Sequence, residues 1–205
     1  PSPMPIVPGH EAAGEIAECG PGVTTVKPGD HVIFSFRPHC GRCRYCATGR
    51  PQLCDQPARA ALAAPGAEPR FRDASGAGLG VFAACGVMAE YATLHTDSVV
   101  KIDKNMPLDK ACLVSCGVLA GAGPVFNRAK VPPGASVAVW GCGGVGLNTI
   151  QAARLVGAGK IIAVDVMPRK LAWAEEFGAT HLVDASKEDP VARVHAISGM
   201  GGVDY

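Results

Sequence analysis

The stretch from Ser136 to Gly146 constrains the fold of this chain more strongly than any other. It begins with a short apolar run rich in β-branched residues, which is typical of a strand buried on both faces of a parallel sheet. It continues with Gly141, Gly143 and Gly146 in the spacing G-x-G-x-x-G, and an apolar pattern with helical periodicity follows. The stretch therefore predicts a strand, a tight turn and a helix in direct succession.

The three glycines match the requirements of a dinucleotide-binding turn. The first allows the tight turn out of the strand, the second lets backbone approach a pyrophosphate, and the third lets the helix lie close to the strand. The anion would bind to unpaired N–H groups at the helix N-terminus, where Gly144 and Val145 lie. On its own the motif is weak, because glycine-rich turns also occur in ordinary βαβ units.

A second apolar strand, predicted over residues 161–164, strengthens the interpretation because it ends in Asp165. An acidic side chain about 20 residues beyond the motif accepts hydrogen bonds from an adenosine ribose. A carboxylate there also repels a 2′-phosphate, so the sequence favours NAD over NADP. Lys170 either reaches the same ribose or is a solvated surface lysine.

Composition excludes several classes of protein. The 205 residues are 48% hydrophobic, which suffices for one large domain or two modest ones. The net charge of +1 lacks the excess positive charge that is typical of proteins that bind nucleic acid or an anionic membrane. No apolar run approaches the roughly 20 residues that span a bilayer, and the proline-rich start lacks the pattern of a signal peptide. We therefore expect a cytoplasmic protein with no nucleic-acid and no membrane partner.

Four of the nine cysteines lie close together, at Cys40, Cys43, Cys46 and Cys54. Four thiolates in one loop can close tetrahedrally on Zn²⁺ and leave no open position, so such a zinc is structural. The alternatives are two disulfides, unusual beside so many other cysteines without a secretion signal, and an iron–sulfur cluster, which usually has another spacing. A zinc ribbon that binds nucleic acid would show two C-x-x-C pairs about 15–20 residues apart and a basic face. The pattern favours structural zinc.

The N-terminal part is predicted to be an antiparallel, barrel-like β domain, because short apolar runs alternate with Pro/Gly turns. The strands expected there cover residues 6–7, 14–19, 23–26, 31–34, 91–94 and 99–102. Residues 55–90, rich in Ala, Gly and Pro, are expected to form a long loop. Further on, we expect helices from residue 107, over about 119–128 and from 168 to 177, and a strand over 181–183. The domain boundary is placed near residue 118, which gives domains 1–118 and 119–205.

The parallel sheet predicted in this way has fewer strands than the about six of a doubly wound nucleotide fold. The chain ends at Tyr205, in a segment typical of a strand that is just beginning. We therefore expect the 205 residues to be an internal part of a longer enzyme.

His10-Glu11, the four-cysteine loop, Cys116-Gly117 and the glycine turn follow one another in this order. With them the chain resembles the zinc-dependent medium-chain alcohol dehydrogenases over essentially its whole length. The resemblance implies a GroES-like β-barrel catalytic domain followed by a Rossmann domain, with two zinc ions per full-length subunit and NAD as cofactors. The long loop and the segment 35–40 resemble the class III and NDMA-dependent bacterial branch more than the polyol dehydrogenases.

The resemblance also implies roles for single residues. His10 is similar to the family histidine that binds a catalytic zinc, Glu11 to the glutamate beside it, and Cys116 to a second ligand of that zinc. Phe36 and Phe82 fall where family members line the alcohol pocket. Without the resemblance, His10 would be taken as a structural histidine and Cys116 as a buried thiol.

The implied chemistry is alcohol oxidation. A zinc with one His, thiolate ligands and an open position binds an alcohol oxygen and lowers its pKa, so that hydride can pass to NAD. The implied substrate is a small alcohol or aldehyde, with a thiol-bound hydroxymethyl group or a polyol as the alternative. The full-length protein is expected to be a homodimer or homotetramer.

Two departures from the family pattern bear on activity. The family's first catalytic cysteine and its proton relay have no counterpart in the 205 residues, and Ala120 stands where many members have Thr. The 205 residues alone are therefore expected to be a non-catalytic, zinc-binding fragment.

Overall fold

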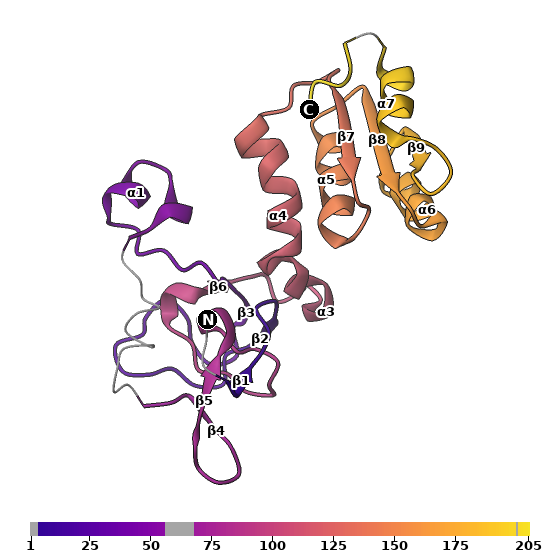
Figure 1. Cartoon of the computed structure of the whole chain (residues 1–205). Coiled ribbons are helices and arrows are strands. Elements are labelled where there is room, and N and C mark those ends of the chain that lie inside the picture. Colours follow the sequence, from indigo (N-terminus) through magenta and orange to yellow (C-terminus); the bar gives the residue numbers. More distant parts are fainter. Residues whose placement is uncertain (1–3, 56–67, 200) are drawn as a thin grey trace. The chain divides into compact units, whose positions relative to one another are not determined.

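The computed structural model describes residues 4–55, 68–199 and 201–205 (Figure 1). The chain separates into two compact units, Pro1–Cys116 and Gly117–Tyr205. The first unit contains short strands and brief helical turns, whereas strands and longer helices alternate in the second.

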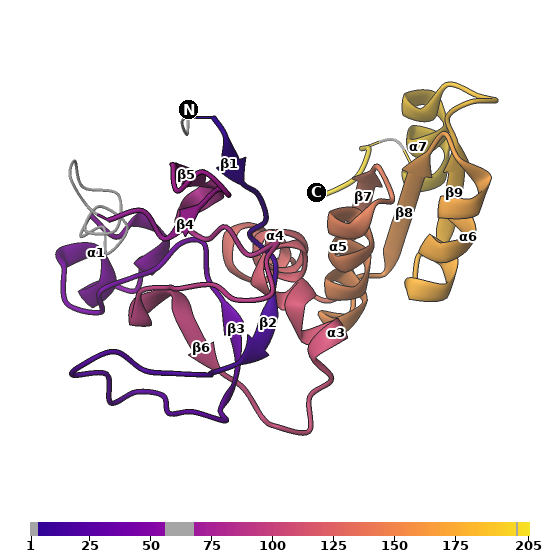
Figure 2. The same ribbon diagram turned by 90° about the horizontal axis from the view of Figure 1, so that it is seen from below.

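The described strands of the first unit form two three-stranded sheets (Figure 2). One sheet has the order β2-β3-β6 and is antiparallel; in the other, β5 runs parallel to β1 and antiparallel to β4. The strands are β1 (Ile6–Val7), β2 (Ala13–Glu15), β3 (His31–Phe34), β4 (Phe71–Arg72), β5 (Gly78–Val81) and β6 (Val99–Lys101). The described strands do not close into the predicted barrel, because strands of two to four residues are too short for a continuous closed ladder.

Brief helical turns connect these strands and complete the first unit. They are α1 (Arg44–Ala47), η1 (Pro51–Leu53), η2 (Phe82–Ala84), η3 (Thr96–Ser98), α3 (Leu108–Ala111) and η4 (Cys112–Ser115). The core includes Val32 of β3, which is 1% exposed. Asp30 is also buried, but its carboxylate accepts hydrogen bonds from Lys101 Nζ at 2.8 Å and from the Lys27 N–H at 3.0 Å. The bond from Lys101 is the main reason that the pKa of Asp30 lies below its usual value.

Three expectations for the first unit were wrong. Residues 23–26 form no strand; Thr25 instead makes a hydroxyl–hydroxyl hydrogen bond of 2.8 Å to Thr96. Residues 91–94 are irregular, and the Thr93 carbonyl accepts its hydrogen bond from Arg70 rather than from a strand. The expected loop 55–90 contains the hairpin β4–β5, while its residues 56–67 lie outside the described residues. Residues distant in sequence determine the backbone conformation of these three segments, and local composition does not reveal such partners.

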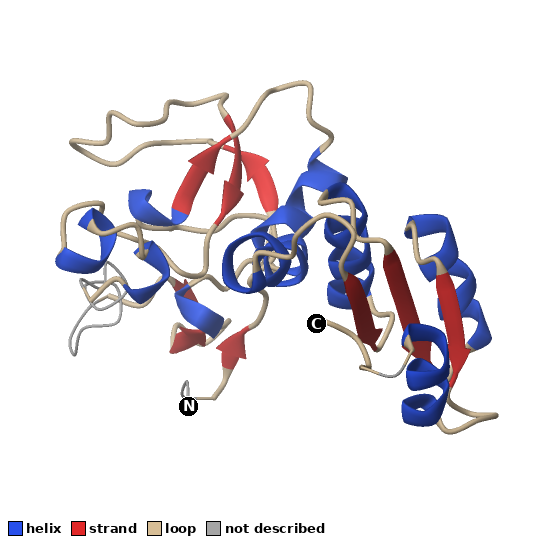
Figure 3. Ribbon diagram, turned by 90° about the horizontal axis from the view of Figure 1, so that it is seen from above, coloured by secondary structure: helices blue, strands red, loops and turns tan. Residues whose placement is uncertain are grey.

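The second unit contains the predicted parallel sheet, with the order β7-β8-β9 (Figure 3). Its strands are β7 (Ser136–Trp140), β8 (Lys160–Asp165) and β9 (His181–Asp184). Its helices are α4 (Gly117–Gly123), the π-helical turn η5 (Pro124–Ala129), α5 (Gly144–Leu155), α6 (Pro168–Phe177) and α7 (Pro190–Ser198). The end of the chain lies beside β7, because the Ala138 N–H donates to the Tyr205 carbonyl at 3.0 Å.

Alternating side chains of β8 supply the two faces of this sheet. Ile161 and Ala163 belong to a core shared with α5 and α6, whereas Ile162 and Val164 belong to a second core completed by β9 and α7. All four side chains are at most 2% exposed. A strand buried on both faces explains why its sequence is a continuous apolar run.

Gly146 brings helix α5 into direct contact with the turn that precedes it. A Cβ at this position would lie 1.9 Å from the Gly141 carbonyl oxygen, which is a backbone atom that cannot rotate away. Gly141 itself has φ of +91°, in the left-handed region that favours glycine. The two glycines therefore set how closely α5 packs on β7.

No single helix in the described residues is long and apolar enough to cross a membrane. One bent pair, Leu108–Ser115 with Gly117–Ala129, reaches the required length and hydropathy only when its two parts are counted together. This is weak support for a span, because a buried core helix meets the same criteria.

Alanine substitution in the first turn of α5 tests the role of Gly146. We expect Gly146→Ala to lower the free energy of unfolding by about 2–3 kcal/mol or more, because the new methyl group must displace backbone. Gly144→Ala is the matched control: its Cβ meets nothing within 4 Å, so helix propensity makes it neutral or stabilising by up to about 1 kcal/mol. Urea unfolding followed by circular dichroism compares them, and equal stabilities would contradict the packing argument.

Candidate functional site

The four clustered cysteines lie together in the first unit, on the segment that carries α1 and η1. Their sulfur atoms are all within 4.8 Å of one another. Cys43 Sγ lies 3.5 Å from Cys46 Sγ and 3.9 Å from Cys54 Sγ, close to the about 3.8 Å between sulfurs of a tetrahedral zinc site. All four are free thiols. The spacing and the soft donor set fit a structural zinc ion.

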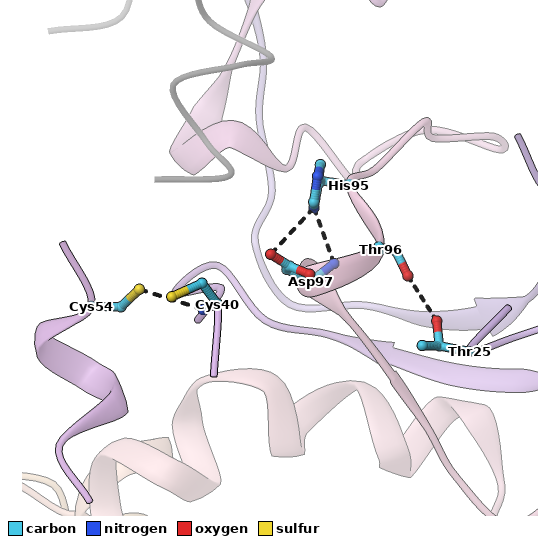
Figure 4. A network of polar contacts seen from close by, with 6 residues as sticks. All are labelled: Thr25, Cys40, Cys54, His95, Thr96 and Asp97. Carbon is cyan, nitrogen blue, oxygen red and sulfur yellow. Dashed lines mark hydrogen bonds and ion pairs between the residues drawn. The ribbon is translucent and has the colours of Figure 1, made fainter. Parts of the chain in front are cut away.

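Backbone N–H groups lower the pKa of one of these thiols, Cys40, which favours the thiolate form that binds metal. Figure 4 shows Cys54 beside Cys40, whose N–H points at the Cys54 sulfur at 3.4 Å. The backbone N–H groups of Arg42 and then Cys43 lower the pKa of Cys40 to about 7, against its partial burial. Burial and the neighbouring Cys43 thiol raise the pKa of Cys46. A divalent cation bound here would displace the remaining protons, so metal affinity must fall in acid.

His10 contacts two aromatic rings of the first unit. Its ring centroid is 5.2 Å from that of Phe36, in an edge-to-face arrangement, and 5.5 Å from that of Phe82. The backbone around His10 is held by the N–H groups of Val87 and Met88, which donate to the carbonyls of Gly9 and Pro8. Phe82 remains 45% exposed, so part of its ring is open to a ligand.

Cys116 ends the first unit and is electrostatically coupled to Glu11. Burial raises the pKa of the Cys116 thiol, and the negative charge of Glu11 raises it further. The neighbouring Ser115 is buried and donates to the Ala12 carbonyl at 3.1 Å, which ties the end of η4 to the segment after His10. Among the described residues, however, only the four cysteines bring three or more metal-ligating atoms together. His10, Glu11 and Cys116 therefore do not form a closed ligand set there.

The glycine turn of the second unit is tied to the end of β8 by one carboxylate. Asp165 Oδ2 accepts the N–H of Cys142, inside the turn, at 2.8 Å, and Asp165 Oδ1 accepts the N–H of Met167 at 2.9 Å. The Gly141 N–H donates to the Val164 carbonyl at 2.8 Å. Turn, strand end and the entry to α6 are thus joined through one side chain.

The charge of Asp165 is retained although its side chain is only 5% exposed. Burial alone would raise the pKa of Asp165, but the N–H groups of Cys142 and Met167, together with the Lys170 ammonium, hold it below its usual value. Lys170 Nζ lies 3.8 Å from Asp165 Oδ2. The lysine therefore faces the carboxylate.

Sequence reasoning missed the N–H groups of Cys142 and Met167, because backbone donors leave no signal in residue identity. It also missed Trp140, which lies at the end of β7 directly before the turn and is 54% exposed. Gly143, the N-cap of α5, has φ of −82°, and a Cβ there would meet nothing within 4 Å. The space above Gly143 is therefore free of protein atoms in the described part of the chain.

Comparison with known proteins gives matches over both units. A profile described as "Alcohol dehydrogenase GroES-like domain" matches residues 1–104, and one described as "Zinc-binding dehydrogenase" matches residues 144–205. The S-(hydroxymethyl)glutathione dehydrogenase of Saccharomyces cerevisiae is 41% identical over 98% of this chain and 54% of its own length. The NDMA-dependent alcohol dehydrogenase of Amycolatopsis methanolica is 46% identical over 93% of this chain and 51% of its own length.

Solved structures give the same result. An alcohol dehydrogenase zinc-binding domain protein from Burkholderia ambifaria superposes with a TM-score of 0.87 at 40% identity, over 100% of this chain and 56% of that one. Benzyl alcohol dehydrogenase from Acinetobacter calcoaceticus gives 0.82 at 36% identity, over 98% and 55%. The chain thus spans about half the length of the relatives it matches.

Removing one thiolate tests the zinc site. We expect purified Cys43→Ser protein to contain one zinc ion fewer than the unsubstituted chain, because its sulfur approaches two of the other three ligands. Inductively coupled plasma mass spectrometry measures the metal content. Cys19→Ser, at an exposed cysteine outside the cluster, should keep the full amount. A Cys43→Ser protein with unchanged zinc would contradict the assignment.

Asp165→Asn tests the carboxylate that joins the turn to β8. At neutral pH we expect a loss of about 1–3 kcal/mol in unfolding free energy, since an amide accepts through only one of its two terminal atoms. The folded-state pKa of Asp165 is lowered, so its stabilisation is present above the unfolded-state pKa of about 4 and is lost as pH falls through the folded-state value. Urea unfolding at decreasing pH should show the two proteins converging in acid; a constant gap would contradict this role.

Proposed function

Because the chain belongs to the zinc-dependent medium-chain alcohol dehydrogenase family, we propose that its protein transfers hydride between an alcohol and NAD. The observation that carries the proposal is the glycine turn held against β8 by Asp165. When bound, NAD supplies the hydride acceptor and zinc supplies a Lewis acid that polarises the alcohol oxygen.

The second unit would bind the dinucleotide through its backbone and one carboxylate. The N–H groups of Gly144 and Val145, in the first turn of α5, would bind the pyrophosphate over the open space at Gly143. A carboxylate has about four lone-pair sites, and backbone donors occupy two at Asp165. The others would accept the ribose hydroxyls, with Lys170 beside them, and the negative charge would reject a 2′-phosphate.

The first unit would hold the alcohol and both metal ions. His10 and Cys116 would ligate the catalytic zinc, with Glu11 beside them. The rings of Phe36 and Phe82 both contact His10, so they would contact the carbon skeleton of the alcohol and exclude water from it. Cys40, Cys43, Cys46 and Cys54 would hold the structural zinc that fixes their loop.

Two substrate classes compete within this reaction. The aromatic walls beside His10 favour an alcohol with an apolar carbon skeleton. The 41% sequence identity to an S-(hydroxymethyl)glutathione dehydrogenase supports a thiol-bound hydroxymethyl group as the second candidate substrate. A polyol fits the apolar walls less well.

The remaining assignments follow from family membership. Residues 1–118 would form the catalytic domain and residues 119–205 the nucleotide-binding domain. The protein would be cytoplasmic and form a homodimer or homotetramer, with no nucleic-acid or membrane partner.

Gly143→Ala separates NAD binding from folding. The new methyl group meets no described protein atom and the backbone φ is ordinary, so we expect the unfolding free energy to change by less than about 1 kcal/mol. The methyl group would occupy the place of the pyrophosphate, so NAD affinity should fall by about tenfold or more. Quenching of Trp140 fluorescence by NAD, with Trp140→Phe as the control for the signal, measures the affinity. Unchanged affinity would place NAD elsewhere.

Alcohol-dependent NADH formation tests the catalytic part. From the zinc-loaded 205-residue chain we expect NAD binding without turnover, because the described residues bring no third ligand to His10 and Cys116. Turnover would contradict that expectation while supporting the reaction. Absence of any NAD binding would instead refute the proposed function.

A further inference from the structure

The segment that carries the four clustered cysteines has a strongly basic surface. We call residues 37–54 the basic lobe, because they contain four arginines and no aspartate or glutamate. These arginines, all of them exposed, are Arg37, Arg42, Arg44 and Arg50. All 18 Asp and Glu residues of the chain lie outside the lobe, where they outnumber the Lys and Arg residues. The lobe is therefore a positive surface on a molecule whose other residues carry a net negative charge.

An aromatic and an apolar side chain lie among these arginines. Arg44 Cζ lies 4.5 Å and Arg50 Cζ 5.6 Å from the centroid of the Tyr45 ring. Leu53 of η1 is 47% exposed. Figures 1 and 2 show the loop that carries α1 at the edge of the first unit, outside its sheets. Arginine and tyrosine are enriched in protein interfaces, where they often contribute most of the binding energy.

Neutral oxygen atoms, rather than acidic side chains, hold the guanidinium groups of the lobe. Arg37 Nη2 donates to the Gln52 carbonyl at 2.8 Å. Arg50 donates to Thr48 Oγ1 through Nη2 at 3.3 Å and through Nε at 3.4 Å. None of the four arginines forms an ion pair with a residue that the structure describes. Their positions are thus partly fixed before binding, while their charges are not neutralised by a neighbouring carboxylate.

A zinc ion on the four cysteines would not neutralise this surface. Four thiolates and Zn²⁺ together carry two negative charges, against the four positive charges of the guanidinium groups. In the described part of the chain, the N–H groups that reach a cysteine sulfur belong to the backbone of Cys40, Arg42 and Cys43. The positive charge of the arginine side chains therefore faces outward from the ligands.

We propose that the basic lobe binds a short acidic segment of another protein. The planar donors of arginine match a carboxylate bidentately, and an apolar side chain of the partner would pack on Leu53. A short peptide contacts the lobe alone. A nucleic acid or an anionic membrane extends further than the Debye length of about 8 Å and would also meet the negative charge of the other residues. The inference goes beyond the proposed function and does not depend on it.

Fluorescence anisotropy with a labelled hexaglutamate peptide tests the lobe. We expect the zinc-loaded 205-residue chain to bind it with a Kd of about 10–100 μM, as a small transient contact does, and not to bind labelled hexalysine. Arg44→Gln and Arg50→Gln should each weaken binding by about threefold or more, because each removes a charged hydrogen-bond donor. Arg128→Gln, which removes the same charge at an exposed arginine outside the lobe, should leave the affinity unchanged.

A further variant protects the test against loss of the zinc loop. Arg37 precedes the first cysteine of the cluster, so Arg37→Gln keeps every residue between the ligands and should weaken binding to the same degree. Mass spectrometry should find equal zinc in all variants. A zinc-loaded chain that does not bind hexaglutamate would overturn the proposal, and so would binding that none of the three lobe variants weakens.

Other occupants of the lobe would give different results. Tighter binding of a single-stranded oligonucleotide, or of phosphatidylserine vesicles, than of hexaglutamate would overturn the proposal in favour of a nucleic acid or a membrane. Analytical ultracentrifugation examines self-association. A dimer that Arg50→Gln dissociates would also overturn it, because a second copy of the chain would then cover the lobe.

Discussion

The carboxylate of Asp165 makes the interaction on which the second unit of this molecule depends. It accepts one N–H from the glycine turn and one from the entry to α6, so a single buried charge fixes both loops at the carboxyl ends of β7 and β8. Burying such a charge is unfavourable unless donors compensate it, and the two N–H groups with Lys170 provide that compensation. The side chain that would select the cofactor thus also shapes the turn that would hold it.

The two units build their sites in different ways. In the first, the cysteine loop gathers four ligands from one short segment, so the geometry is local and a metal ion can complete it. His10 and Cys116 are far apart in sequence, and the hydrogen bond from the Ser115 hydroxyl to the Ala12 carbonyl ties the segment after His10 to the residue before Cys116. Among the described residues, only the cysteine cluster brings three or more possible metal ligands together. In the second unit, parallel strands bring the site residues to one edge.

Features set by interactions between residues close in sequence were predicted well, whereas features set by distant partners were not. The glycine turn, β8 and the cysteine cluster depend on neighbours within a few residues or on strict periodicity, and these were predicted correctly. The strand expected over residues 91–94 was wrong because Arg70, distant in sequence, takes the Thr93 carbonyl. The hairpin β4–β5 was missed because its strands are short and β5 pairs with β1, which is distant in sequence. The contact of Cys142 with Asp165 could not be predicted, since a backbone donor is present at almost every residue.

The most direct test of this account is a crystal structure of the chain grown with zinc and NAD. We expect tetrahedral metal density among Cys40, Cys43, Cys46 and Cys54, the pyrophosphate on the first turn of α5, and a ribose within hydrogen-bonding distance of Asp165. A dinucleotide bound away from the glycine turn, or a cysteine loop closed by disulfides in place of metal, would contradict it.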